Sequence, residues 1–476
     1  MGAMLRVSRK VPLVVKELRR SYVDVDSVCT VIVRRYKVAD LVDIVICLDK
    51  HGSVRYLVIE PEIDEIGIRV YKALMSYLYT SVTRIEDTER LKDALNEAAR
   101  ELGIEEEFHK RYEVLWYYIY RDSFGYGILE PLFRDPKVED IELSDWRNPV
   151  TVVHRDFLSY EALITNIVFR SEAEVRAYIE RLAIKSGKAI SLAKPELHAT
   201  LPEGYRIAAT LGEPVSSSPS FDIRKFPQVP IDIITLINEG VLSYEVAALM
   251  WMLNDAKLFY CIMGGSGTGK TTLLNAVLQL SNPAWKIIVV QDIPEIKLPR
   301  RPRFIQLYGD TSSEQLKRCI TALRYRPDLL VVGEVRGREI RALVRAVASG
   351  SGSATTFHAS SPSEFEMAVR NLLPRDLYIM LSLNTGVLVH IGKVKDGGQV
   401  SRKVLGVYEK DGSSWRPIYL YKQYSHIDKC LTLRRIGERM LIENPVEELY
   451  RRIEILKNIP PGYDNVERFM MKFYGV

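Results

Sequence analysis

The chain has 476 residues, too many for one ordinary hydrophobic core, so two or three domains are expected. Its 66 basic and 61 acidic side chains leave a formal net charge of +5, too mild an excess to indicate nucleic-acid binding by itself. The apolar runs are much shorter than the roughly 20 residues of a membrane span, so any membrane contact should be peripheral. The five cysteines lie far apart without a Cys-x-x-Cys pair, which predicts neither a disulfide framework nor a zinc site and indicates a reducing compartment.

Residues 1–115 are predicted to form a small mixed α/β domain. Alternating apolar stretches indicate strands, and segments with helical periodicity follow them. The expected strands include 31–33, 44–46 and 56–59, and the expected helices are 68–79 and 85–102.

Residues 116–230 are predicted to form a second mixed α/β domain. Its expected elements are strands at 150–154, 206–210 and 221–226 and an amphipathic helix at 172–186. The run Pro227-Gln228-Val229-Pro230 is typical of a linker between domains.

Residues 231–476 alternate apolar strands with helical stretches, which indicates a doubly wound α/β sheet. Thr311 and Glu314 form a capping box for a helix that should run to Leu323. The tail is predicted to end in helices, one of them with Asn444 as N-cap and Pro445 at the first helical position.

A glycine-rich loop follows the strand-like run 258–263 and leads into a helical segment. Strand, loop and helix in this order are the context of a Walker A P-loop, whose backbone N–H groups surround phosphates. Lys270 would place its charge on the β and γ phosphates, and Thr271 would hold Mg²⁺. ATP is thus the expected substrate and Mg²⁺ the expected cofactor. The nucleotide-binding residues are Gly264, Gly265, Ser266, Gly267, Thr268, Gly269, Lys270, Thr271 and Thr272.

Acidic residues end the next two predicted strands. Residues 286–290 lead into Gln291-Asp292-Ile293-Pro294-Glu295, at the strand end where α/β sheets place their chemistry. The apolar run 329–333 ends in Glu334, which indicates a Walker B segment. Gly333 stands where many P-loop enzymes carry a metal-binding Asp, so Glu334 is expected to bind the metal.

His358 follows the strand-like residues 354–357. An isolated histidine more often has a structural role. Its position one strand beyond the Walker B segment instead favours a role in sensing the γ phosphate.

These segments resemble the secretion ATPase superfamily, which comprises the motors of type II secretion, type IV pili, archaeal pili and archaella and their type IV secretion relatives. Residues 291–295 resemble its Asp box, 326–337 its Walker B segment and 350–358 its His box, and 125–141 are similar to its second N-terminal domain. The resemblance covers about residues 120–420, and the N-terminal pattern without a cysteine-rich insert favours the archaeal branch.

The resemblance implies a RecA-type P-loop motor domain after two smaller mixed α/β domains, the second of them PAS-like, and a hexameric ring with nucleotide between motor and N-terminal domains. It makes Glu295 the acid that activates water. Gln291 and Ser351 depart from the family pattern, which has an acid and a histidine there. The arginines that match the family's site residues are Arg206, Arg224, Arg324 and Arg336; a surface ion pair is the alternative for each.

The resemblance also implies partners: a polytopic membrane platform protein and, through it, pilin-like subunits. The protein would then be cytoplasmic and peripherally associated with the cytoplasmic membrane. No nucleic acid is expected, since the sequence shows no basic stripe with interleaved aromatic residues. Two other functions stay open: a conjugation or nucleic-acid translocating RecA-type ATPase, and a nucleotide-gated scaffold with weak turnover.

Overall fold

The computed structural model of the protein describes residues 23–81, 87–227, 229–396, 399–412 and 414–476. Contacts among these residues divide the chain into two compact units, the first ending at Lys225 and the second beginning at Phe226. The predicted linker starts directly after this boundary. The further division of the first unit near residue 115 stays a prediction.

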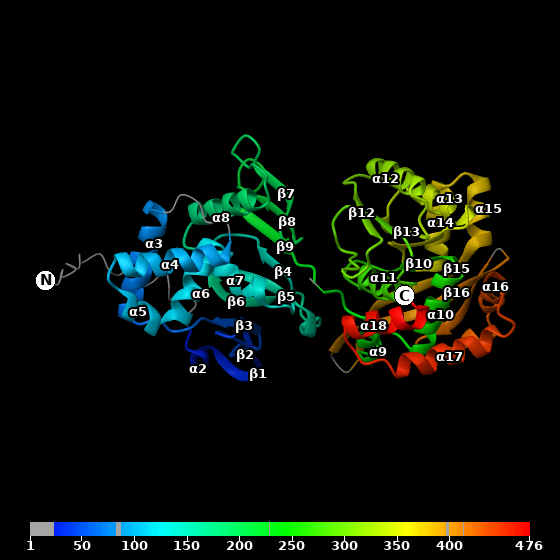
Figure 1. Ribbon diagram of the computed structural model, residues 1–476, viewed down its shortest axis with the longest axis horizontal. Coiled ribbons are helices and arrows are strands. Elements are labelled where there is room, and N and C mark those ends of the chain that lie inside the picture. The colour runs from blue at the N-terminus through cyan, green and yellow to red at the C-terminus, as the bar shows by residue number, and fades with distance from the viewer. Residues whose placement is uncertain (1–22, 82–86, 228, 397–398, 413) are drawn as a thin grey trace. The chain divides into compact units, whose positions relative to one another are not determined.

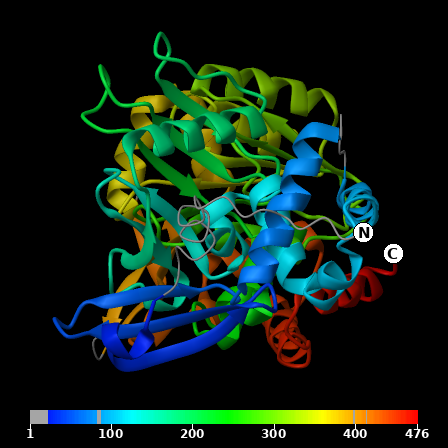
Figure 2. The same ribbon diagram turned by 90° about the vertical axis from the view of Figure 1, so that its left-hand side faces the viewer.

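The first unit contains a sheet that has nine strands in the described residues, in the order β1-β2-β3-β6-β5-β4-β9-β8-β7. Strands β1 to β3 form an antiparallel ribbon, dark blue in Figures 1 and 2, and β3 joins β6 in parallel. The expected strands are confirmed, except that the one expected at 221–226 ends at Arg224. The strands are β1 Cys29–Val38, β2 Val42–Asp49, β3 Val54–Ile59, β4 Val138–Leu143, β5 Pro149–His154, β6 Leu163–Val168, β7 Glu196–Thr200, β8 Arg206–Thr210 and β9 Ser220–Arg224.

Helices cover one face of this sheet and share an apolar core with it, whereas the short helix at residues 25–28 packs on the other face. The helices expected at 68–79 and 172–186 are confirmed as α3 and α8, and the one expected at 85–102 as α4, apart from residues 85 and 86, which lie outside the described ranges. The helices of this unit are α2 Val25–Val28, α3 Glu65–Ser81, α4 Thr88–Glu101, α5 Glu105–Lys110, α6 Tyr112–Ser123, α7 Glu130–Arg134 and α8 Glu172–Lys185.

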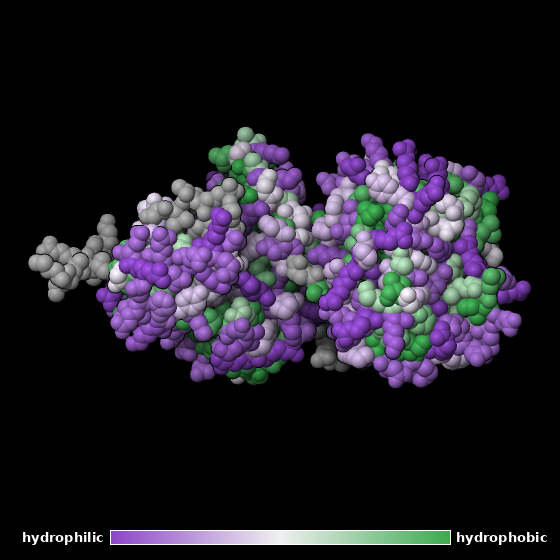
Figure 3. Space-filling model, in the orientation of Figure 1, coloured by the Kyte–Doolittle hydropathy of each residue, from purple (hydrophilic) through white to green (hydrophobic). Residues whose placement is uncertain are grey.

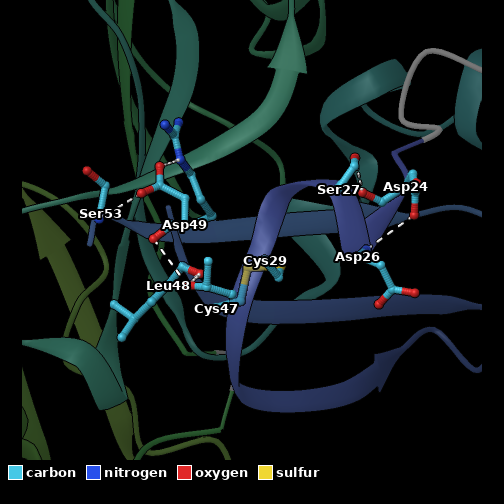
Figure 4. The surroundings of a disulfide bond; sticks show 10 residues. Asp24, Asp26, Ser27, Cys29, Cys47, Leu48, Asp49 and Ser53 are labelled. Atoms are coloured by element: carbon cyan, nitrogen blue, oxygen red, sulfur yellow. Dashed lines mark hydrogen bonds and ion pairs between the residues drawn. A yellow bond between two sulfur atoms is a disulfide. The ribbon is translucent and has the colours of Figure 1, made fainter. Parts of the chain in front are cut away.

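Cys29 and Cys47 form a disulfide between β1 and β2, with their Cα atoms 5.6 Å apart (Figure 4). The prediction that no disulfide forms is therefore wrong, and the inference of a reducing compartment loses its basis. The antiparallel pairing of β1 with β2 brings together two cysteines 18 residues apart, which their spacing in the sequence does not reveal. The disulfide closes a small apolar cluster with Val45 and Leu57 on the second face of the ribbon.

The second unit is a doubly wound α/β sheet, as predicted. Its order over the described residues is β12-β11-β13-β14-β10-β15-β16-β17-β18. The strands from β12 to β15 are parallel, and those from β15 to β18 pair antiparallel. They are β10 Phe259–Met263, β11 Ile287–Gln291, β12 Phe304–Tyr308, β13 Leu329–Val335, β14 Gly352–Phe357, β15 Thr385–Asp396, β16 Gln399–Asp411, β17 Ser414–Leu420 and β18 Tyr424–Ser425.

Helices cover both faces of the second sheet (Figure 1). Alternate residues of β10 separate the two cores: Tyr260 and Ile262 pack with α9 to α11 and α16 to α18, whereas Phe259 and Cys261 pack with α12 to α15. The helices are α9 Ile233–Asn238, α10 Tyr244–Asp255, α11 Lys270–Gln279, α12 Ser312–Arg324, α13 Ile340–Ala348, α14 Pro362–Leu372, α15 Arg375–Asn384, α16 Leu431–Met440, α17 Pro445–Lys457 and α18 Tyr463–Tyr474.

The predicted helix caps in this unit are confirmed. The Thr311 hydroxyl accepts a hydrogen bond from the N–H of Glu314 at 3.2 Å, and the Asn444 side chain accepts one from the N–H of Glu447 at 3.2 Å. None of the helices among the described residues is both long enough and apolar enough to cross a bilayer. On the face of the molecule drawn in Figure 3, hydrophilic residues predominate and hydrophobic ones form small separate groups.

Candidate functional site

The glycine-rich loop joins β10 to α11 at the carboxyl end of the parallel strands. Gly264 lies so close to β15 that a Cβ atom would be 2.2 Å from the carbonyl oxygen of Ile391. Gly267 and Gly269 have φ angles of +65° and +93°, which L side chains rarely adopt. Because α11 begins directly after the loop, loop amides and a helix N-terminus come together, an arrangement that suits phosphate binding.

Lys270 is folded against this loop. Its Nζ donates hydrogen bonds to the carbonyl oxygens of Gly264 at 3.0 Å and Gly265 at 2.8 Å, and it lies 3.4 Å from Nε2 of His358. Burial lowers the pKa of the Lys270 ammonium group, although Glu334 acts in the opposite direction. A phosphate anion beside Nζ would favour the charged form.

Glu334 connects two of the other predicted site residues. Its Oε1 lies 2.6 Å from Nε2 of His358, and its Oε2 accepts a hydrogen bond from Nε of Arg336 at 2.6 Å. Strand β14, which ends just before His358, lies between β13 and β10 in the sheet. The fold therefore gathers Lys270, Glu334, Arg336 and His358 at one edge.

Glu295 lies in the loop that follows β11 and is half-buried. Its charge acts on the pKa values of both Lys270 and Arg336, which indicates that it lies close to the same cluster. Asp292 of this loop lies 3.4 Å from Nη1 of Arg336, measured from its Oδ2. The structure thus brings the predicted Asp box next to the predicted Walker segments.

Three amide side chains hold the loop after β11 that carries Glu295. Sequence reasoning missed them or gave them no role. The carbonyl of Ile296 accepts from Nε2 of Gln291 at 3.3 Å and from Nε2 of Gln306 at 2.7 Å, and the N–H of Lys297 donates to Oδ1 of Asn275 at 2.9 Å. A polar Asn275 inside the apolar run of α11 is the signal that could have found one of these contacts.

Two basic residues of the β15–β16 pair also reach the loop, and nothing in their local sequence predicts it. Arg402 donates from Nε to the carbonyl of Gly267 at 3.1 Å. Nζ of Lys393 would lie 3.6 Å from a Cβ placed on Gly267. The contact arises because β15 lies beside β10, the strand that precedes the loop.

Arg324 is not brought to this cluster within the chain. It ends α12, and the carbonyl of the next residue, Tyr325, accepts from Nζ of Lys286 at 2.8 Å just before β11 begins. Arg324 therefore lies at the amino-terminal edge of the parallel strands. Ser351 lies at this edge too, since its hydroxyl donates to the carbonyl of Pro327 at 2.8 Å.

Arg206 and Arg224 belong to the first unit. They stand opposite each other in the register of β8 and β9, and both are exposed. Nε of Arg224 donates to Oδ1 of Asp140 at 2.9 Å. Residues opposite each other on neighbouring strands project to the same face, so the two guanidinium groups form a basic pair.

A family model described as type II/IV secretion system protein matches residues 154–389. An uncharacterized protein of Methanocaldococcus jannaschii is 31% identical over 409 residues, which cover 79% of this chain and 73% of that protein. A Mycobacterium tuberculosis protein provisionally named a conjugal transfer protein is 29% identical over 314 residues, covering 60% of this chain and 86% of that protein. The solved structure of the Yersinia pseudotuberculosis ATPase DotB is 16% identical and covers 70% of this chain and 86% of its own, with a TM-score of 0.46. The family match and the long alignment with the Methanocaldococcus jannaschii protein establish that this chain belongs to the type II/IV secretion system protein family.

Proposed function

We propose that the protein hydrolyses ATP and drives protein secretion or the assembly of a type IV-like filament. The observation that carries the proposal is the cluster beside the glycine loop. Nζ of Lys270 lies 3.4 Å from His358, and His358 lies 2.6 Å from Glu334. Membership of the secretion family supports the same function.

The loop and the N-terminus of α11 would bind the phosphates of ATP. Lys270 would leave the carbonyl oxygens of Gly264 and Gly265 for the β and γ phosphates, where its charge gains a counterion. Hydroxyl and carboxylate oxygens are ligands that Mg²⁺ accepts, so Thr271, in the first turn of α11, and Glu334 suit that ion. When bound, Mg²⁺ neutralises charge that develops on the phosphates.

Glu295 would act as general base. Its carboxylate takes a proton from the attacking water, the water oxygen bonds to the γ phosphorus, and the bond from that phosphorus to the bridging oxygen breaks to release ADP. His358 would hydrogen-bond the γ phosphate. After this phosphate is cleaved and released, His358 would again contact the carboxylate of Glu334.

The test of this site is Lys270→Ala, assayed by steady-state phosphate release. Turnover should collapse because the β and γ phosphates lose their main side-chain counterion. Lys286→Ala, at the opposite edge of the sheet, is the matched control and should retain turnover. Hydrolysis by Lys270→Ala near the wild-type rate would refute the site, and a wild type without measurable release would favour the nucleotide-gated scaffold.

We assign the active form to a homo-hexameric ring in which Arg206 and Arg224 complete a nucleotide site, with Arg324 and Arg336 as further candidates. The exposed basic pair on β8 and β9 supports this role for the first two. Replacing either of these two by Ala should reduce kcat far more than ATP affinity, because such an arginine stabilises charge mainly in the transition state.

The control for this ring test is Arg147→Ala, which removes an exposed arginine of the same unit that pairs with Asp145. It should leave kcat unchanged. Wild-type activity per chain should also rise with protein concentration as rings form. Constant activity across the dilution range in which light scattering reports dissociation to monomers would refute the shared site.

The proposed partners are a polytopic membrane platform protein and, through it, pilin-like subunits, which would keep the protein at the cytoplasmic side of the membrane. The match to a Methanocaldococcus jannaschii protein supports an archaeal filament or secretion system. Conjugal transfer is the second candidate, favoured by the name of the Mycobacterium tuberculosis relative. A salt-dependent mobility shift with single-stranded DNA would favour that candidate, and no shift at low salt would count against it.

A further inference from the structure

The loop that carries Glu295 is closed by a buried amide side chain. Gln291 is the last residue of β11 and is 3% exposed. Its Oε1 accepts the N–H of Ile296 at 3.0 Å, and its Nε2 donates to the carbonyl of Ile296 at 3.3 Å. One side chain thus satisfies both backbone polar groups of the residue that directly follows Glu295.

Residues of β12, α11 and β13 also contact this loop or make room for Gln291. Gln306 of β12 donates to the same carbonyl, and Asn275 of α11 accepts the N–H of Lys297. Gly333 of β13 leaves room for Gln291, since a Cβ at position 333 would lie 3.1 Å from the Cβ of Gln291. The loop is therefore tied to two strands and to the helix that begins at Lys270.

We propose that Gln291 is a positioning residue for Glu295 and that this loop requires a neutral amide rather than a carboxylate. The proposal rests on the general-base role proposed for Glu295. A carboxylate at position 291 could accept the N–H of Ile296 but has no proton to donate to its carbonyl. It would place two acceptors about 3.3 Å apart in a buried site, which is unfavourable. The glutamine is thus matched to the loop and is no sign of a weakened catalytic centre.

The central test compares Gln291→Glu with the wild type. If the amide positions Glu295, placing a carboxylate at position 291 should lower kcat by about 10- to 100-fold, since small displacements of a catalytic group are costly. ATP affinity should stay within about twofold, because the side-chain hydrogen bonds of Gln291 within the described residues join it to Ile296 and not to the glycine loop. Gln291→Met keeps similar volume without hydrogen bonds and should behave likewise, so the test survives if one variant does not fold.

A second set of variants separates positioning from a general structural role. In a Glu295→Gln background, Gln291→Glu should lower kcat by less than about twofold, because the acid that it positions is already gone. The activity of Gln291→Glu relative to wild type should also rise as pH falls, because a protonated carboxyl group can donate to the Ile296 carbonyl instead of facing it as a second charged acceptor.

Gln279→Glu is the matched control. Gln279 is fully buried in α11, and its Nε2 donates to the carbonyl of Tyr463 at 2.7 Å. This variant makes the same chemical change away from the loop and should lower the melting temperature while kcat of the folded enzyme is retained.

Distinct results would overturn the proposal. An unchanged or higher kcat in Gln291→Glu, or a loss that adds in full to that of Glu295→Gln, would show that Gln291 does not position the acid. If Glu295→Gln alone leaves turnover intact, the general-base role itself is wrong, and the inference fails with it.

Discussion

Replacing Lys225 by methionine should remove a pH dependence from the stability of the first unit. Lys225 follows β9 and is 8% exposed. Its Nζ donates to the carbonyl oxygens of Leu132 and Asp135. Burial lowers its pKa to about 7, although the charges of Asp135 and Glu130 act in the opposite direction.

The direction of this pH dependence follows from the pKa of Lys225 in the folded and in the unfolded chain. In the unfolded chain its pKa is 10.5, so between pH 7 and 10.5 the unfolded state binds more protons than the folded state. The free energy of unfolding therefore rises with pH in this window, and the destabilisation is complete only below pH 7. At 1.36 kcal/mol per pH unit, it amounts to about 5 kcal/mol in full, of which about 2 kcal/mol is relieved between pH 7 and 9.

Urea unfolding at pH 7, 8 and 9, followed by pulse amide exchange and mass spectrometry, reports the first unit separately from the second. Relative to Lys225→Met, the wild type should gain about 2 kcal/mol over this range. Lys194→Met, which removes an exposed lysine of the same unit, should keep the wild-type slope. Equal slopes for the wild type and Lys225→Met would refute the lowered pKa.

Further outcomes are expected at other sites. Glu295→Gln should keep Mg·ATP binding and slow turnover by about 10²- to 10⁴-fold, whereas Glu334→Gln should weaken Mg²⁺-dependent binding; the reverse pattern would exchange their roles. Arg402→Ala should weaken ATP affinity about fivefold by removing one hydrogen bond to the loop, and an unchanged Kd would make that contact incidental. Replacing Cys29 and Cys47 by Ser should lower the unfolding free energy of the first unit by about 3 kcal/mol, because a closure spanning 18 residues is lost; equal urea midpoints for variant and wild type would contradict this.

The motor fold and most of its site could be predicted because the relevant residues stand at the carboxyl ends of parallel strands. Such strand ends meet at one edge of a sheet, whatever the rest of the chain does. Lys270 after β10, Glu334 near the end of β13 and His358 after β14 are therefore neighbours. The sequence order of the motifs was enough to place them together.

Other contacts depend on which strands become neighbours, and local sequence does not encode that. Arg402 reaches the glycine loop only because β16 pairs with β15 and β15 with β10. The disulfide between Cys29 and Cys47 could not be predicted for the same reason, because it depends on the pairing of β1 with β2. Arg324 illustrates the converse, since the direction of α12 places it at the other edge of the sheet, away from the cluster within its own chain.

The hydrogen bonds of Glu334 suggest how nucleotide binding and sensing are linked. Its Oε1 is next to His358 and its Oε2 next to Arg336, so both oxygens already have a partner. A magnesium ion at Glu334 would compete with His358 and Arg336 for these carboxylate oxygens. His358 lies 3.4 Å from the ammonium group proposed to hold the γ phosphate, so a released imidazole would find a phosphate oxygen as its new partner. His358 would thus change its hydrogen-bond partner from Glu334 to the γ phosphate when ATP binds. Because His358 directly follows β14, the strand between the Walker A and Walker B strands, this change would couple the presence of the γ phosphate to the position of β14.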